Sequence, residues 1–168
     1  MRTVTSFPLP VREIEHVAVP LPDGCRLAAR IWLPEEAEAD PVPAILEYIP
    51  YRKNDLTAVR DASMHPYVAG HGYAVVRLDL RGAGDSQGRL LDEYLPQEIQ
   101  DGCDAIEWIA SQPWCDGNVG MYGGSYLGIT QYMAASTAPP ALKAIAPSRA
   151  SALWPRAHRQ SRPWSSLQ

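Results

Sequence analysis

Residues 119–128, VGMYGGSYLG, decide how this chain folds. The apolar start of the stretch predicts a buried strand, the pattern after Ser125 predicts an α-helix, and Gly123 and Gly124 allow a sharp turn between them. This junction is typical of the nucleophile elbow of hydrolases, so we expect the Ser125 hydroxyl to project above the carboxyl end of a sheet. The backbone N–H of Tyr126, at the positive end of the helix, would then point toward a developing oxyanion.

The same stretch also allows a purely structural interpretation. A strict GxSxG motif is absent, because Leu127 stands two residues after the serine and the next glycine is Gly128. In many α/β proteins a serine in a glycine-rich turn only caps the helix that follows. The local pattern alone therefore leaves both roles open for Ser125.

Strands and helices alternate on the amino-terminal side of this stretch and beyond it. Residues 14–33 hold two apolar segments around a Pro-Asp-Gly turn, which predicts an antiparallel hairpin. Other apolar runs predict buried strands, with helical segments between them. The expected strands are 44–49, 73–80, 118–122 and 142–147, and the expected helices are 65–72, 96–110 and 126–137. The alternation predicts an α/β fold in which helices cover both faces of a mostly parallel sheet that opens with the hairpin.

Some side chains have expected places in this fold. Arg81 and Asp85 could pair and fix the loop RGAGDSQG, and Asp79 is expected to be structural because it precedes the serine. The residues expected on the buried face of the helix that starts at Pro96 are Ile99, Cys103, Ile106 and Ala110. The residues expected to favour the dipole at its start are Glu98 and Asp101. The residues expected to be structural are Trp108, Trp114, His16, His65 and His71.

Composition limits the function further. The chain has 168 residues and a net charge of −4, which suits one domain and gives no basic footprint for nucleic acid or an anionic membrane. Cys25, Cys103 and Cys115 lack the spacing of a disulfide framework or a zinc site. We expect a cytoplasmic protein with no metal, no other cofactor and no membrane segment.

Five ordered blocks of the sequence resemble the CocE/NonD family, which contains cocaine esterase, X-prolyl dipeptidyl-peptidases and α-amino-acid ester hydrolases. The blocks are LPDGCRLAARIWLP, PAILEYIPYRKND, HGYAVVRLDLRGAGDSQG, DAIEWIASQPWCDGNVGMYGGSYLG and PPALKAIAP. The resemblance implies an α/β-hydrolase fold, in which GxSYxG is the nucleophile turn and Ser125 the nucleophile. It also implies that the hydroxyl of Tyr51, in the PYR segment, is the second oxyanion donor beside the N–H of Tyr126.

The sequence after Ser125 raises an expectation of incompleteness. An α/β-hydrolase takes its triad in the order serine, acid, histidine, yet the last acid of this chain is Asp116 and only His158 follows the serine. The resemblance implies that the acid and the histidine come later, after a helical cap, and that a jelly-roll domain follows. We therefore expect a truncated hydrolase domain that is nearly inactive alone.

This expectation defines the domains and the partners. The expected organisation is a lead-in at residues 1–13, a partial hydrolase domain at 14–147 and an irregular tail rich in Arg, Trp and Pro at 148–168. The expected substrate is a small ester or peptide, cleaved through an acyl-enzyme on Ser125. The expected protein partners are the missing carboxyl-terminal half or a second copy of the chain. The alternative function is a non-catalytic remnant or binding module of the same fold.

Overall fold

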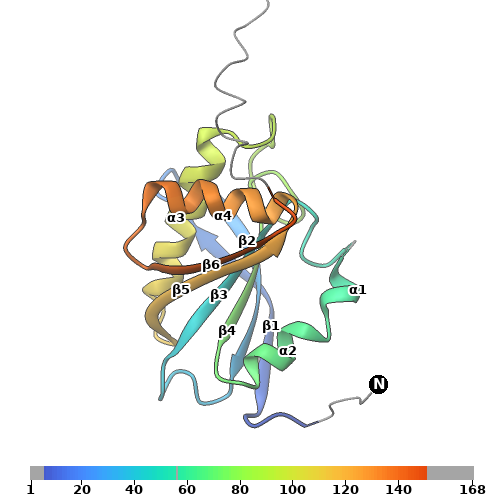
Figure 1. Ribbon diagram of the computed structural model, residues 1–168, viewed down its shortest axis with the longest axis vertical. Coiled ribbons are helices and arrows are strands. Elements are labelled where there is room, and N and C mark those ends of the chain that lie inside the picture. Colours follow the sequence, from blue (N-terminus) through green and yellow to red (C-terminus); the bar gives the residue numbers. More distant parts are fainter. Residues whose placement is uncertain (1–5, 56, 151–168) are drawn as a thin grey trace, which may run out of the picture.

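The computed structural model describes residues 6–55 and 57–150, which fold around a single six-stranded sheet (Figure 1). The order of the strands is β1-β2-β4-β3-β5-β6. The elements are β1 (Val11–Pro20), β2 (Arg26–Pro34), β3 (Val42–Ile49), α1 (Ala58–Asp61), α2 (Met64–Ala69), β4 (Ala74–Asp79), α3 (Pro96–Ala110), β5 (Cys115–Gly124), α4 (Tyr126–Thr137) and β6 (Leu142–Ser148). The predicted α/β fold, with a mostly parallel sheet and an antiparallel hairpin at its start, is confirmed, whereas α1 was not predicted.

β1 and β2 form the predicted hairpin at one end of the sheet. The Asp23 carboxylate holds the turn by accepting the backbone N–H of Cys25 at 3.0 Å. β1 begins at Val11, earlier than the domain start expected at residue 14, because Val11 still pairs with Pro34 of β2. The segment expected as a lead-in thus contains the start of the first strand, while residues 1–5 lie outside the described part of the chain.

Parallel pairing joins β4, β3, β5 and β6, so the carboxyl ends of these strands lie at one edge of the sheet. The loops that follow them carry Tyr51 after β3, Arg81 after β4 and Ser125 after β5. Ligands of open α/β sheets bind outside this edge. The topology therefore brings Tyr51 and Ser125, which are distant in the sequence, to the same edge of the sheet.

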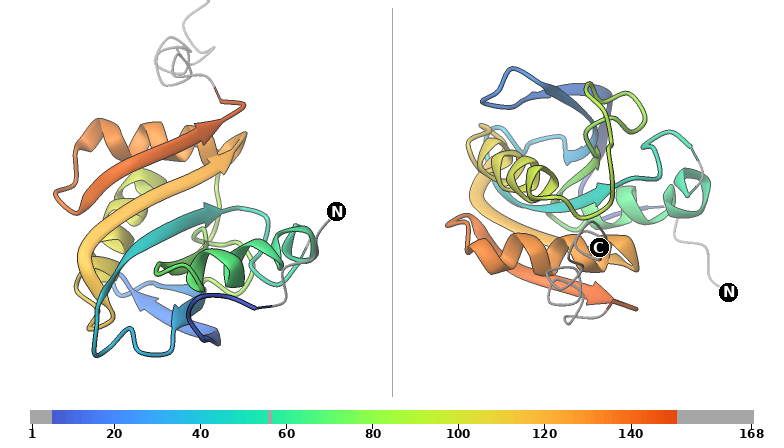
Figure 2. Two further views of the ribbon diagram at one scale, coloured as in Figure 1. Left: turned by 60° about the horizontal axis from the view of Figure 1, so that its bottom comes forward. Right: turned by 90° about the horizontal axis from the view of Figure 1, so that it is seen from above.

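Helices cover both faces of the sheet (Figure 2). Tyr48 of β3 faces α3 and donates a hydrogen bond to the backbone oxygen of Glu98 at 3.3 Å. The adjacent Glu47 faces the other way and meets His65 of α2, as the alternation of side chains along a strand requires. Within the described part of the chain, no helix is long and apolar enough to cross a membrane.

α2 ends at Ala69, three residues before the predicted end at Gly72. The N–H of Gly70 still donates to the carbonyl of Pro66 at 2.8 Å, as in an α-helix, and Gly72 takes a φ of 91° in the turn to β4. A Cβ at Gly70 would lie 2.4 Å from the Cβ of Phe7, so only glycine allows the N-terminal segment to pack on this helix end.

The buried face of α3 is rotated from the predicted one. Ile106 is fully buried, but Ile99 and Cys103 are only half-buried. The buried residues of α3 are Glu98, Asp101, Gly102, Ala105, Ile106 and Ile109. The prediction was wrong because it followed apolar residues only, whereas two carboxylates of this helix find polar partners inside the protein.

The predicted pair between Arg81 and Asp85 is not formed. Arg81 instead grips Asp101 of α3 with two hydrogen bonds, from Nε to Oδ2 at 2.6 Å and from Nη2 to Oδ1 at 2.8 Å. Its Nη2 also bonds to Asp23 of the hairpin turn at 2.8 Å. The planar guanidinium binds both oxygens of one carboxylate, and Asp101 offers its carboxylate in this geometry. Arg81 therefore ties α3 to the hairpin.

An apolar hollow of about 280 Å³ lies over β3, β5 and β6. The residues that line it are Pro43, Ala44, Ile45, Tyr73, Asn118, Val119, Gly120, Met121, Tyr122, Lys143, Ala144, Ile145 and Ala146. Of the tail expected to be irregular, only residues 148–150 belong to the described part, and His158 lies outside it.

Candidate active site

Ser125 lies at the sharp junction between β5 and α4. Its backbone has φ 59° and ψ −120°, a conformation that is strained for any residue with a side chain. Backbone hydrogen bonds hold the strained residue. Its N–H donates to the carbonyl of Ser148 at 2.9 Å, and its carbonyl accepts the N–H of Gly128 at 2.9 Å and that of Ile129 at 3.2 Å. Its side chain makes no capping hydrogen bond to α4, which contradicts the helix-cap interpretation, and the residue is exposed.

The glycines around Ser125 are required by close packing. A Cβ at Gly124 would lie 2.7 Å from the hydroxyl oxygen of Ser148, and a Cβ at Gly128 would lie 2.5 Å from the Cβ of Ala150. Both distances are shorter than side chains tolerate. Gly128 thus has a structural reason for its place three residues after the serine, where the strict motif would have a glycine one residue earlier.

A cavity of about 720 Å³ opens beside Ser125. Its lining comes from the loops after β3, β5 and β6 and from the region of α1 and α2. The lining residues are Glu47, Tyr51, Thr57, Met64, Tyr122, Gly123, Gly124, Ser125, Leu127, Ala146, Ser148 and Arg149. The volume is within the range of pockets that bind small molecules.

Tyr51 lines the same cavity as Ser125. It is half-buried in the loop after β3 and packs against the main core. The structure therefore brings together the two side chains that the sequence singled out, although they come from different strands.

The side chain of Tyr126 is buried on the side of the sheet that α3 covers. Its hydroxyl donates a hydrogen bond to Glu98 at 2.8 Å, and its ring stacks on that of Tyr94 with 4.5 Å between centroids. Burial, followed by the field of Glu98, raises the pKa of Tyr126. The backbone N–H of Tyr126 lies in the first turn of α4, where amides have no acceptor within the helix. Its side chain thus anchors the start of α4.

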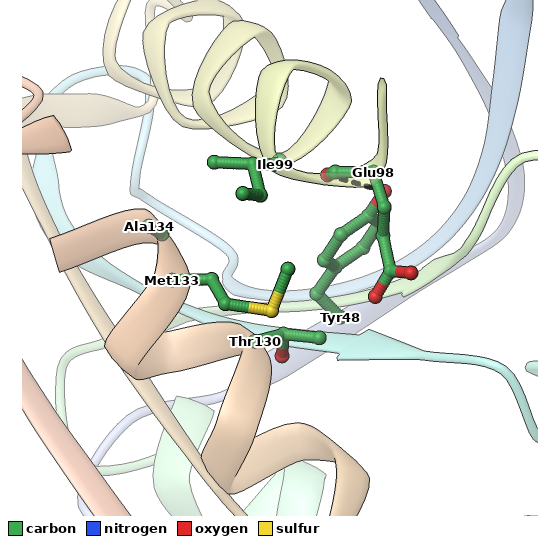
Figure 3. A pocket seen from close by; sticks show the side chains of 7 residues that line it. Tyr48, Glu98, Ile99, Thr130, Met133 and Ala134 are labelled. Carbon is green, nitrogen blue, oxygen red and sulfur yellow. Dashed lines mark hydrogen bonds between the residues drawn. The ribbon is translucent and has the colours of Figure 1, made fainter. Parts of the chain in front are cut away.

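Glu98 is a buried carboxylic acid, which the sequence predicted only to favour the dipole at a helix start. Its Oε2 accepts hydrogen bonds from Tyr126 and from the backbone N–H of Tyr94, while its Oε1 is buried without a partner among the described residues. Figure 3 shows its carboxylate pointing away from Ile99 and Met133, which line a small apolar cavity beside it. Burial is the largest cause that raises the pKa of Glu98 to about 7.

We expect Glu98→Gln to change how the stability of the chain depends on pH. Because the pKa of Glu98 in the folded chain lies above the ordinary value of 4.5, folding favours the protonated acid. The resulting stabilisation is complete below about pH 4.5 and is lost as the pH rises toward 7. Glutamine stays neutral throughout. Between pH 5 and 8 the wild type should lose stability relative to the variant by a factor of roughly ten to a hundred in its unfolding equilibrium.

Limited proteolysis measures this difference, since cleavage follows the population of opened chain. The ratio of wild-type to variant cleavage rates cancels the pH dependence of the protease and should rise with pH. Glu107→Gln, which removes an exposed carboxylate from the same helix, is the matched control. A ratio that stays flat for Glu98→Gln would contradict the assignment of a buried, neutral acid.

A second buried cluster reaches the cavity from the other face of the sheet. Arg77 Nη1 donates to Oε2 of Glu47 at 2.7 Å, and the same oxygen lies 3.2 Å from Nε2 of His65. The His65 ring stacks on Trp32 with 4.4 Å between centroids, so the histidine is structural as expected. Among the described residues, no histidine lines the cavity beside Ser125. In the sequence, the only sign of this cluster was that Glu47 and Arg77 each interrupt an apolar run that predicts a strand.

Comparison with known proteins places the chain among hydrolases. Residues 23–163 match the family described as X-Pro dipeptidyl-peptidase (S15 family). A cocaine esterase from Rhodococcus sp. (strain MB1 Bresler) is 46% identical over 142 residues, which cover 82% of this chain and 23% of that protein. The chain thus spans about a quarter of the length of this relative.

Solved structures agree with this placement. A CocE/NonD family hydrolase from Staphylococcus aureus superposes with a TM-score of 0.69 and 30% identity, covering 79% of this chain and 26% of that one. An α-amino acid ester hydrolase superposes with a TM-score of 0.64 and 27% identity, covering 86% of this chain and 26% of that one. Fold and sequence therefore point to the same group of proteins.

Proposed function

The chain belongs to the X-Pro dipeptidyl-peptidase (S15) family, and on this premise we propose that it carries the nucleophile and the oxyanion hole of a serine hydrolase. The observation that carries the proposal is the strained, exposed Ser125 at a strand-to-helix junction that shares one cavity with Tyr51. Catalytic elbows combine this strain with this exposure. The substrates are esters or X-Pro peptides, and the high identity to a cocaine esterase favours esters.

The proposed reaction proceeds through an acyl-enzyme. The Ser125 hydroxyl oxygen attacks the carbonyl carbon while a general base takes its proton, and the carbonyl oxygen becomes an oxyanion bound by the Tyr51 hydroxyl and the Tyr126 N–H. Collapse of this intermediate expels the alcohol or amine, which receives the proton. Water then attacks the acyl-enzyme by the same route, releasing the acid and restoring Ser125.

The base and its supporting acid come, in this proposal, from outside the 168 residues. No Asp or Glu follows Asp116 in the sequence, and His158 is the one histidine after Ser125. Glu47 reaches the cavity, but Arg77 and His65 already bind its Oε2. Serine without a base stays protonated and is a weak nucleophile.

A chimera tests the proposal. Residues 6–150 of this chain replace the aligned segment of the Rhodococcus cocaine esterase, which supplies the remaining length. The chimera should hydrolyse p-nitrophenyl esters and should react with a fluorophosphonate probe on Ser125. Parallel assays with an X-Pro p-nitroanilide decide between ester and peptide substrates. A folded chimera, judged by circular dichroism, that neither turns over nor reacts would refute the proposal.

Tyr51→Phe in the chimera should lower kcat about 10²-fold while KM changes little. The substitution removes only the hydroxyl oxygen, so it abolishes an oxyanion donor and keeps the packing of the ring. Tyr73→Phe is the matched control, because Tyr73 is exposed and lies outside the cavity beside Ser125. Equal kcat values for Tyr51→Phe and the wild-type chimera would remove Tyr51 from the oxyanion hole.

A further inference from the structure

The loop that carries Tyr51 contains a strained residue. Arg52 has a φ of 66°, in the left-handed region that a residue with a side chain adopts at a cost of about 1 kcal/mol or more. Its exposed side chain pairs with Asp55, with 2.9 Å between Nη2 and Oδ2. A surface ion pair contributes little, so another contact must hold the backbone here.

Asp79 supplies that contact from the end of β4. Its side chain is fully buried, and its backbone lies beside Ile49, the last residue of β3. Its Oδ1 accepts the backbone N–H of Lys53 at 2.5 Å, and its Oδ2 accepts the backbone N–H of Asp85 at 3.1 Å. One carboxylate therefore joins the loop after β3 to the loop after β4.

An ion pair between Lys53 and Asp85 also connects these two loops. The Lys53 side chain is only 1% exposed, and its Nζ lies 2.5 Å from Oδ2 of Asp85. The hydrogen bond from Lys53 is the main cause that lowers the pKa of Asp85. A Cβ at Gly84 would lie 2.1 Å from Oδ2 of Asp79, so the loop wraps tightly around the buried carboxylate. The loop backbone has little freedom to relax.

We propose that Asp79 is a positioning residue of the oxyanion hole, which fixes the backbone at Lys53 and thereby directs the Tyr51 hydroxyl toward Ser125. Asp79 is not among the residues that line the cavity, so it acts through the loop and does not touch substrate. The inference rests on the proposed role of Tyr51. Its chemistry is specific to a carboxylate, because only two acceptor oxygens on one side chain can bind both N–H groups.

The test is a double-mutant cycle between Asp79 and Tyr51 in the chimera. In Asp79→Asn one oxygen becomes an amino group that faces a backbone N–H, so one of the two bonds is lost while the shape is kept. We expect kcat to fall about tenfold with KM nearly unchanged. In the Tyr51→Phe background Asp79→Asn should have almost no further effect on kcat, because the hydroxyl that it positions is gone.

Equal losses in both backgrounds would show that Asp79 is merely structural and would overturn the inference, as would an unchanged kcat. Asp85→Ala alters a half-exposed side chain and should give a smaller loss with the same dependence on Tyr51, which keeps the test valid if Asp79→Asn does not fold. Asp40→Asn, in the exposed loop between β2 and β3, is the matched control.

Amide hydrogen exchange separates this inference from the proposed function. Asp79→Asn should speed exchange of the Lys53 amide whatever the role of Tyr51 is, because the substitution removes or weakens the acceptor of that amide. Faster exchange together with an unchanged kcat for Tyr51→Phe would refute the oxyanion role of Tyr51, while Asp79 would still hold the loop at Lys53. Unchanged exchange would refute the proposal that Asp79 fixes the backbone at Lys53.

Discussion

Ser125→Ala in the chimera is expected to abolish turnover, with a loss of about 10⁵ to 10⁶-fold in kcat. Alanine removes the oxygen that would attack the substrate and form the acyl-enzyme. The fold should persist, because the hydrogen bonds that hold this strained position come from backbone atoms of Ser148 and Gly128, and alanine keeps them. A loss of activity without a loss of structure is therefore the signature of the nucleophile.

A fluorophosphonate probe reads out the same substitution without any substrate. The wild-type chimera should bind the probe covalently, and a peptide containing residue 125 should carry the added mass. The Ser125→Ala form should stay unlabelled, whereas Ser148→Ala should still react although its hydroxyl belongs to the same cavity. Labelling that survives the loss of Ser125 would show that another residue is the nucleophile.

The second large effect concerns the 168-residue chain by itself. We expect its turnover of p-nitrophenyl esters to lie at least about 10⁴-fold below that of the chimera, because a serine that lacks a general base remains protonated. The described cavity offers a carboxylate in Glu47, yet its Oε2 is already held by the buried Arg77 and His65. The elbow and the oxyanion donors would leave only a weak residual rate.

This measurement also distinguishes the two functions that the sequence left open. A non-catalytic binding module would leave both the chain and the chimera without turnover, whereas a hydrolase segment would leave only the chain inactive. We also expect the chain alone to be marginally stable or to aggregate, because the apolar hollow over β3, β5 and β6 is exposed. Sedimentation and urea unfolding of the chain test this expectation. A monomeric chain that unfolds cooperatively and shows ordinary esterase turnover would contradict both expectations.

The sequence by itself determined the elements and the elbow. Apolar runs and helical periods identified every strand and the helices α2, α3 and α4, because the periods of burial along strands and helices are local properties. Gly123 and Gly124 marked the turn at Ser125 for the same reason, since backbone strain acts between neighbouring residues. Tyr51 had no such local signal and was found only through the resemblance to a family.

Only the tertiary structure decided which charged groups are buried and what they hold. Glu98 was expected only to favour the dipole at the start of a helix, yet it is buried and anchors Tyr126. Arg81 was expected to pair with Asp85, yet it binds Asp101. Asp79 joins two loops that the sequence separates by two helices and a strand. The physical reason is that a carboxylate is stable inside a protein only where hydrogen-bond donors from other elements surround it. Which donors surround it depends on how the elements pack, and not on the neighbouring residues in the chain.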